Sequence, residues 1–94
     1  MDKHDNKRES LIANHAALFF NRESDRTSLI TVTGCRLSQG GKMADIIISV
    51  LPADKSESAL AFAKRKRSDL REYLATNGRF RNPPRVEIVL ENQL

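Results

Sequence analysis

Apolar and polar residues alternate with two different periods along the chain, and these periods divide it into helices and strands. Helical spacing predicts a first helix over residues 5–21 and a longer helical region over residues 54–76. Strands are predicted over residues 29–37, 43–51 and 85–90, where β-branched residues are frequent or apolar and polar residues alternate. The residues between the first helix and the first strand form a polar loop without periodicity.

The first two strands are predicted to form an antiparallel hairpin. Ser38-Gln39-Gly40-Gly41 suits its turn, because glycine tolerates the positive φ that such turns demand. Gly34 within the first strand suggests a bulge or a close backbone approach. The residues expected to face the core are Ala44, Ile46, Ile48 and Val50 in the second strand and Val86, Ile88 and Leu90 in the third.

The ends of the helical region carry capping signals. Asp54 followed by Glu57 predicts a capping box at its start, and Asn77-Gly78 predicts a left-handed exit at its end. A helical crossover then joins the second and third strands, which should run parallel. The expected order is α-β-β-α-(break)-α-β, an α+β domain in which the helices cover one face of a three-stranded mixed sheet in two layers.

The long helical region contains a conflict between periodicity and charge. Leu60, Ala63, Leu70 and Leu74 form one apolar stripe, yet position 67 near its middle is Arg within the run Lys64-Arg65-Lys66-Arg67. Either Arg67 extends its charged end out of a packed face, or the helix breaks here and its halves bury different faces. In the second case Ser68 would cap a new helix with Asp69 in its first turn. A helix start among cations favours an anion, with phosphate the obvious candidate.

Composition and charge bound the class of protein. The 94 residues make one domain, 1–94, in which residues 1–6 are expected to be frayed. The sequence shows neither a membrane span nor a secretory signal, and its single cysteine fits the reducing cytoplasm, where we expect the protein to reside. The net charge is +4, and residues 56–85 hold eight Lys or Arg against three acids. An anionic partner is therefore plausible.

Candidate catalytic and metal-binding residues are few. His4, His15 and Cys35 share no ligand spacing, and His15 on the apolar side of the first helix fits a partly buried structural role. Cys35 in a strand fits a small apolar packing residue, and no phosphate-cradling glycine motif is present. We therefore expect no enzyme, no cofactor, no metal and no small-molecule substrate.

The basic run and the cations that follow it are the candidate nucleic-acid contacts. Tyr73 and Phe80 are the only aromatic residues that we expect near them, which favours phosphate and groove contacts over base stacking. Arg36 and Lys42 on the hairpin are weaker candidates. The predicted RNA-binding residues are Lys64, Arg65, Lys66, Arg67, Ser68, Arg71, Arg79 and Arg81.

Several segments, in this order and spacing, resemble the ribosome-binding factor A family over roughly residues 8–93. They are Ser24-Asp25-Arg26, Ser28-Leu29-Ile30-Thr31-Val32-Thr33, Leu37-Ser38, Ala44-Asp45-Ile46-Ile47-Ile48-Ser49-Val50, Leu70-Arg71-Glu72-Tyr73-Leu74, Arg79-Phe80-Arg81-Asn82-Pro83-Pro84 and Val86-Glu87-Ile88. The resemblance implies a type II KH-like domain. It also implies a ribosome assembly factor that binds 16S rRNA and the 30S subunit during late maturation and rRNA processing, without catalysis.

The chain departs from the family pattern at the junction of its two helices. Lys66-Arg67-Ser68 stands where the family has a kinked Ala-x-Gly, so the kink is either capped by Ser68 or milder than in the family. The turn after Ser38 also differs from the family's Pro-Asp-Leu. We expect a monomer without a membrane partner. The alternative is a protein-interaction module that docks on a ribosomal protein or self-associates through its sheet edge.

Overall fold

The computed structural model describes residues 3–24 and 26–94, with side chains from residue 7 onward. Residues 1 and 2 of the segment expected to be frayed, and Asp25, lie outside this description; α1 begins at Lys3. The elements are α1 (Lys3–Glu23), β1 (Leu29–Ser38), β2 (Met43–Leu51), α2 (Ser56–Arg65), α3 (Arg67–Asn77) and β3 (Arg85–Leu90). This order confirms the predicted α-β-β-α-α-β arrangement.

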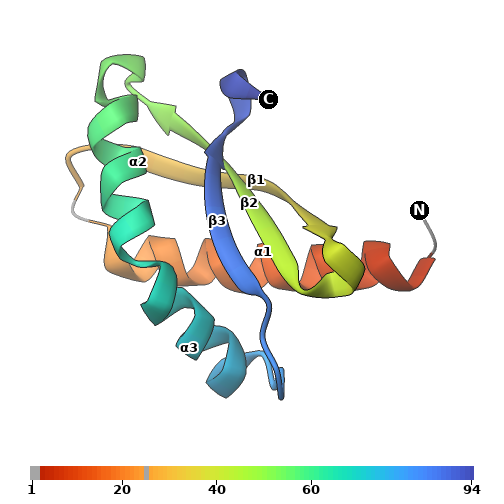
Figure 1. Cartoon of the computed structure of the whole chain (residues 1–94). Helices are drawn as coiled ribbons and strands as arrows, with labels where there is room; N and C mark the ends of the chain where they lie inside the picture. The colour runs from red at the N-terminus through yellow and green to blue at the C-terminus, as the bar shows by residue number, and fades with distance from the viewer. Residues whose placement is uncertain (1–2, 25) are drawn as a thin grey trace.

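The three strands form one mixed sheet in the order β1-β2-β3 (Figure 1). β1 and β2 are antiparallel, and β2 and β3 are parallel, as the hairpin and the helical crossover predict. The register shifts between Val32 and Gly34, so Thr33 is the extra residue of the bulge suggested by Gly34. Gly40 and Gly41 both have positive φ in the turn between β1 and β2, as predicted.

The helices pack on one face of the sheet, where alternate strand residues are buried. Side chains from all three strands and all three helices share a single core. The predicted inward residues of β2 and β3 are all buried there: Ala44, Ile46, Ile48, Val50, Val86, Ile88 and Leu90. The fold is therefore the two-layer α+β domain expected from the sequence.

The helical spacing of Leu11, Ile12, His15, Leu18 and Phe19 predicts one apolar face for α1, and the buried face differs from it. Ile12, Ala16, Phe19 and Phe20 are buried, whereas Leu18 is 58% exposed. These four residues follow the i, i+4, i+7, i+8 spacing of one helix face, and Leu11 and Leu18 lie outside that stripe. Burial therefore selects the stripe that includes the small Ala16, at which the helix can approach the sheet closely.

Both predicted capping signals of the helical region are wrong in detail. Asp54 lies in a short 3-10 turn, and the N-cap of α2 is Lys55, which makes no side-chain capping bond. Gly78 has an ordinary right-handed conformation, and Arg79, one residue later, has the left-handed φ of 58°. Gly78 is instead required by space, because a Cβ there would lie 2.8 Å from the Leu74 carbonyl and from the Phe80 ring.

Cys35 lies in β1, half-buried and packed against the core, as predicted for a small apolar residue. Burial, assisted by the negative charges of Glu9 and Asp45, raises the pKa of its thiol to about 12 from an ordinary 9.0. The thiol is thus held in its neutral, unreactive form.

We expect alkylation of Cys35 by iodoacetamide at pH 8 to be about a thousandfold slower in the folded protein than in denaturant, because three pKa units separate the two thiols. The same shift should make folding less favourable as the pH rises from about 9 towards 12, since the unfolded thiol ionises first. Mass spectrometry of the alkylated protein measures the rates. Equal rates in the folded and unfolded chain would contradict this environment.

Candidate nucleic-acid interface

The cationic run lies at the break between α2 and α3. α2 ends at Arg65, Lys66 has non-helical angles (φ −94°, ψ 7°), and α3 begins at Arg67. The break lets both helices bury their apolar sides, with Ala59 and Ala63 in α2 and Leu70 and Leu74 in α3. Of the two alternatives left by the sequence, the helix break is therefore correct.

The predicted cap at this break is wrong. Ser68 lies in the first turn of α3, one residue after its start, and the N-cap is Lys66, which makes no side-chain capping bond. The backbone of Lys66 serves both helices, because its N–H donates to the Ala63 carbonyl and its carbonyl accepts from Leu70. The junction is thus closed by main-chain hydrogen bonds, and the Ser68 side chain faces a groove instead.

Arg67 stabilises the junction with its guanidinium. Its Nε donates to the Lys64 carbonyl at 3.0 Å, a group at the end of α2 that has lost its next helical partner. One terminal nitrogen donates to both carboxylate oxygens of Glu87 on β3, at 2.9 and 3.1 Å. The anion that we expected at this helix start is therefore supplied in part by the chain itself.

Lys66 is also paired within the chain. Its Nζ lies 3.5 Å from Glu23 at the end of α1, 3.9 Å from Asp69 and 5.8 Å from the centre of the Phe62 ring. The side chain is only 31% exposed. These contacts connect the helix break to α1. Lys66 is a weaker candidate for an external phosphate than its exposed neighbours.

Ser68, Arg71 and Arg81 line one open groove between α3 and the loop that leads to β3. The groove has a volume of about 390 Å³, and Glu72, Ala75, Asn82 and Pro83 complete its walls. The Nε of Arg71 donates to the Pro83 carbonyl at 3.2 Å, which holds this guanidinium at the groove wall. We call these residues the arginine groove.

The loop after α3 holds two further predicted residues at the surface. Arg79 and Arg81 are exposed on either side of Phe80, which is half-buried and packs against the core. The guanidinium of Arg8 lies 5.8 Å from the centre of the Phe80 ring. Phe80 therefore anchors the loop, and the two arginines face solvent.

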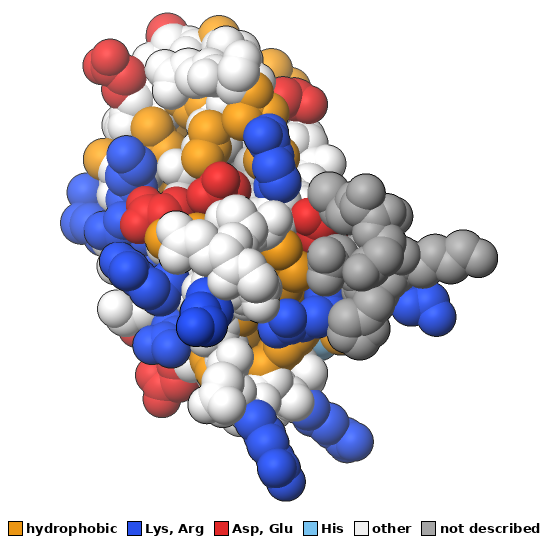
Figure 2. Space-filling view, turned by 45° about the vertical axis from the view of Figure 1, so that its right-hand side comes forward, with side chains coloured by type: hydrophobic (Ala, Val, Ile, Leu, Met, Phe, Trp, Pro, Cys, Tyr) orange, Lys and Arg blue, Asp and Glu red, His pale blue; other side chains and the backbone are white. Residues whose placement is uncertain are grey.

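Lys64 and Arg65 are exposed at the end of α2, and Arg65 reaches a second, smaller pocket beside α1. Figure 2 shows that Lys and Arg side chains gather on one side and at the lower end of the molecule. The two views differ by a turn about the vertical axis, so this lower end corresponds to α3 and its following loop in Figure 1. The eight predicted residues thus divide into a paired centre and exposed flanks.

Metal-binding clusters and membrane-spanning helices are both absent from the described part of the chain. No three His, Cys, Asp or Glu side chains there lie close enough to hold a metal ion. No helix among the same residues has the length and apolar character to span a membrane. His15, as predicted, is half-buried beside Tyr73, with 6.2 Å between ring centres.

A solved structure has the same fold. The crystal structure of ribosome-binding factor A from Thermus thermophilus superposes with a TM-score of 0.83 and 25% sequence identity, over 94% of this chain and 97% of that one. This chain is a ribosome-binding factor A-like protein. No protein-family model and no curated protein matches its sequence significantly. The ribosome-binding factor A-like fold is therefore kept while most of the side chains differ.

Replacing Arg67 by Ala should destabilise the protein by about 1 kcal/mol, because it removes an ion pair and the side-chain donor to the Lys64 carbonyl. For a domain of this size the midpoint of thermal unfolding should fall by roughly 4–8 °C. Urea unfolding measures the free energy. Lys64→Ala is the matched control, since its exposed side chain makes none of these contacts, and equal stability of the two variants would contradict the role of Arg67.

Proposed function

We propose that this chain is a ribosome assembly factor that binds 16S rRNA and the 30S subunit during late maturation and rRNA processing, as a cytoplasmic monomer without catalysis. The structural neighbour is named as a ribosome-binding factor, which supports a ribosomal target for a chain of the same fold and nearly the same length. The observation that carries the proposal is the arginine groove, where exposed arginines from two segments line one open surface.

The chemistry of the arginine groove suits a nucleic-acid backbone. Arginine recognises phosphate through a planar fork of donors and cannot be deprotonated in proteins. The hydrogen bond from Arg71 to Pro83 fixes one side of the guanidinium and leaves its terminal nitrogens for a ligand. Ser68 adds a hydroxyl at the same wall. Such a surface binds phosphates, while specificity comes from rRNA shape and from unpaired bases.

The alternative, a protein-interaction module, has support at another place. Leu29 and Leu51 are partners at one end of the β1–β2 ladder, and both are more than half exposed. Strand addition along β1 is less favourable, because the Glu9 carboxylate already accepts a hydrogen bond from the Leu37 N–H at 2.8 Å. A docking contact on a ribosomal protein would therefore use the end of the hairpin.

The double variant Arg71→Gln/Arg81→Gln should co-sediment less with small ribosomal subunits than the wild type. Its log–log salt dependence for single-stranded RNA should be shallower by about 0.7 for each phosphate that the variant no longer binds. The matched control is Lys7→Gln/Lys55→Gln, which removes the same charge at two exposed positions that do not line the groove. Binding of each variant at two salt concentrations gives this salt dependence.

If both double variants bind small ribosomal subunits equally less well than the wild type, net charge alone drives binding. This result would contradict a defined groove. Binding by wild type that is insensitive to salt and survives nuclease would favour the protein-interaction alternative.

A further inference from the structure

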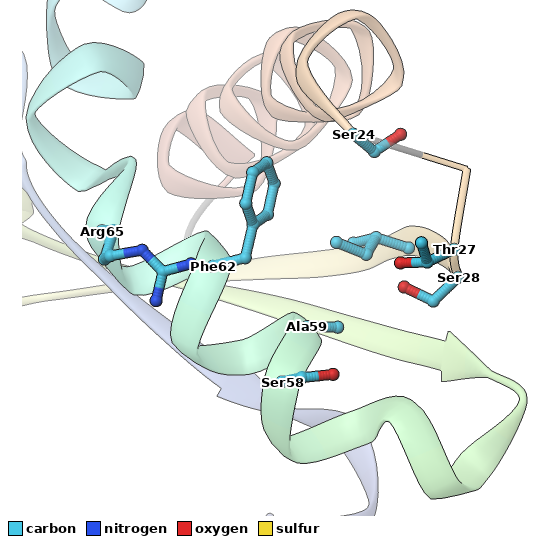
Figure 3. A pocket seen from close by; sticks show the side chains of 8 residues that line it. Ser24, Thr27, Ser28, Ser58, Ala59, Phe62 and Arg65 are labelled. Carbon is cyan, nitrogen blue, oxygen red and sulfur yellow. The ribbon is translucent and has the colours of Figure 1, made fainter.

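A second pocket lies on the other side of the helix break from the arginine groove. It is formed by the end of α1, the residues before and within the start of β1, and α2, and it has a volume of about 170 Å³ (Figure 3). Its lining residues are Ser24, Thr27, Ser28, Ile30, Ser58, Ala59, Phe62 and Arg65. Only Arg65 among them belongs to the predicted RNA-binding residues.

The pocket combines an apolar floor with a rim of hydroxyl groups. Ile30 and Ala59 belong to the core, and Phe62, half-buried, forms a wall. Figure 3 shows the hydroxyls of Thr27, Ser28 and Ser58 on one side of this space, with the Phe62 ring projecting from α2 towards α1 on the other side. The Ser58 hydroxyl donates to the Lys55 carbonyl at 3.1 Å, so it offers a ligand an acceptor, whereas the Ser28 hydroxyl can donate or accept.

A flat heterocycle fits this combination better than an ion or an aliphatic chain. Its faces can lie against Phe62 and the apolar floor while its polar edge meets the hydroxyl rim. An inorganic anion would leave the aromatic wall unused, and an alkyl group would leave the hydroxyls without partners from the ligand. The volume is below the range of about 300–1,000 Å³ typical of pockets for drug-sized ligands, which favours one ring system over a whole nucleotide.

The cation at the end of the pocket suggests what is attached to that ring. Arg65 is exposed and adjoins Lys64, so a phosphate linked to a bound base would meet positive charge at the mouth. Arg65 and Ser68 are three residues apart on opposite sides of the break, and Ser68 lines the arginine groove. One RNA strand that crosses the break can therefore reach both surfaces.

We propose that the pocket around Phe62 and Arg65 binds one unpaired nucleobase of a single-stranded RNA, with the adjoining phosphate at Arg65. This proposal rests on the proposed RNA-binding function and adds a base-binding site to it. It also corrects the expectation from the sequence that only Tyr73 and Phe80 lie near the cations, since the centre of the Phe62 ring is 5.8 Å from Lys66 Nζ and Phe62 lies one helical turn before Arg65.

The variant Phe62→Leu keeps an apolar wall but removes the stacking surface. It should weaken binding of a mixed-sequence single-stranded RNA octamer by about fivefold or more, the scale of one base–aromatic stack, in fluorescence anisotropy. Binding of a duplex RNA of equal length should be unchanged, because paired bases cannot enter the pocket. The second variant, Ser28→Ala/Ser58→Ala, should weaken single-strand binding severalfold and guards against a folding defect of Phe62→Leu, which thermal unfolding checks.

The outcomes separate this proposal from the proposed function. Single-strand binding that is abolished in Arg71→Gln/Arg81→Gln but intact in both pocket variants would overturn the base site and leave the RNA-binding function standing. Equal weakening for single strand and duplex would also overturn it. If the wild type binds neither RNA nor subunits, both proposals fail.

A direct probe uses the ligand fragment alone. Uridine 5′-monophosphate should shift the backbone amide resonances of Ser28, Ser58 and Phe62 in a saturable way, and inorganic phosphate should not. Equal shifts with inorganic phosphate would mean that an anion binds at Arg65 without a base, and this outcome would overturn the proposal.

Discussion

The connection between β2 and β3 has to be folded within the length of the sheet that it covers. A straight helix over residues 56–77 would be about 33 Å long, at 1.5 Å per residue, which exceeds the length of about 30 Å for the nine residues of β2 and about 20 Å for the six of β3. The break at Lys66 divides it into helices of ten and eleven residues that both pack on the sheet. The buried alanines of α2 and leucines of α3 depend on this change of direction.

The break also determines where the charges of the basic run lie. Ending α2 leaves carbonyl groups without helical partners, and Arg67 supplies a donor to one of them. Glu87 and Glu23 then neutralise Arg67 and Lys66 from two different elements. The cations at the centre of the run thus stabilise the fold, and those on its two sides stay exposed to partners.

The sequence predicts those features of the fold that depend on short-range patterns. Strand β2, its two faces, the bulge near Gly34 and the helix break all follow from spacing within about ten residues. The predictions that are wrong concern positions where neighbouring residues compete for the same structural role. Ser68 is a good capping residue, but burial of Leu70 and Leu74 fixes the N-cap of α3 two residues earlier, at Lys66, whose main-chain bonds close the junction.

The candidate site could be predicted only in part, because its character depends on contacts between distant residues. Arg67 and Glu87 are 20 residues apart, and nothing in the local pattern indicates that they pair. The pocket beside Arg65 combines residues from α1, the start of β1 and α2, so no single segment reveals it. Spacing within a helix does place Phe62 one turn before Arg65, and that signal was available from the sequence.

The separation of the exposed cations bears on the kind of anion that they suit. A compact anion is held best where several donors converge on one point, but Arg67 and Lys66 at the centre are already neutralised by carboxylates. The exposed charges lie instead in two places, at Arg65 and along the arginine groove, on opposite sides of the break. In physiological salt such groups act over only about 8 Å, so each must contact its own phosphate. An extended polyanion provides that series of contacts, and a small anion does not.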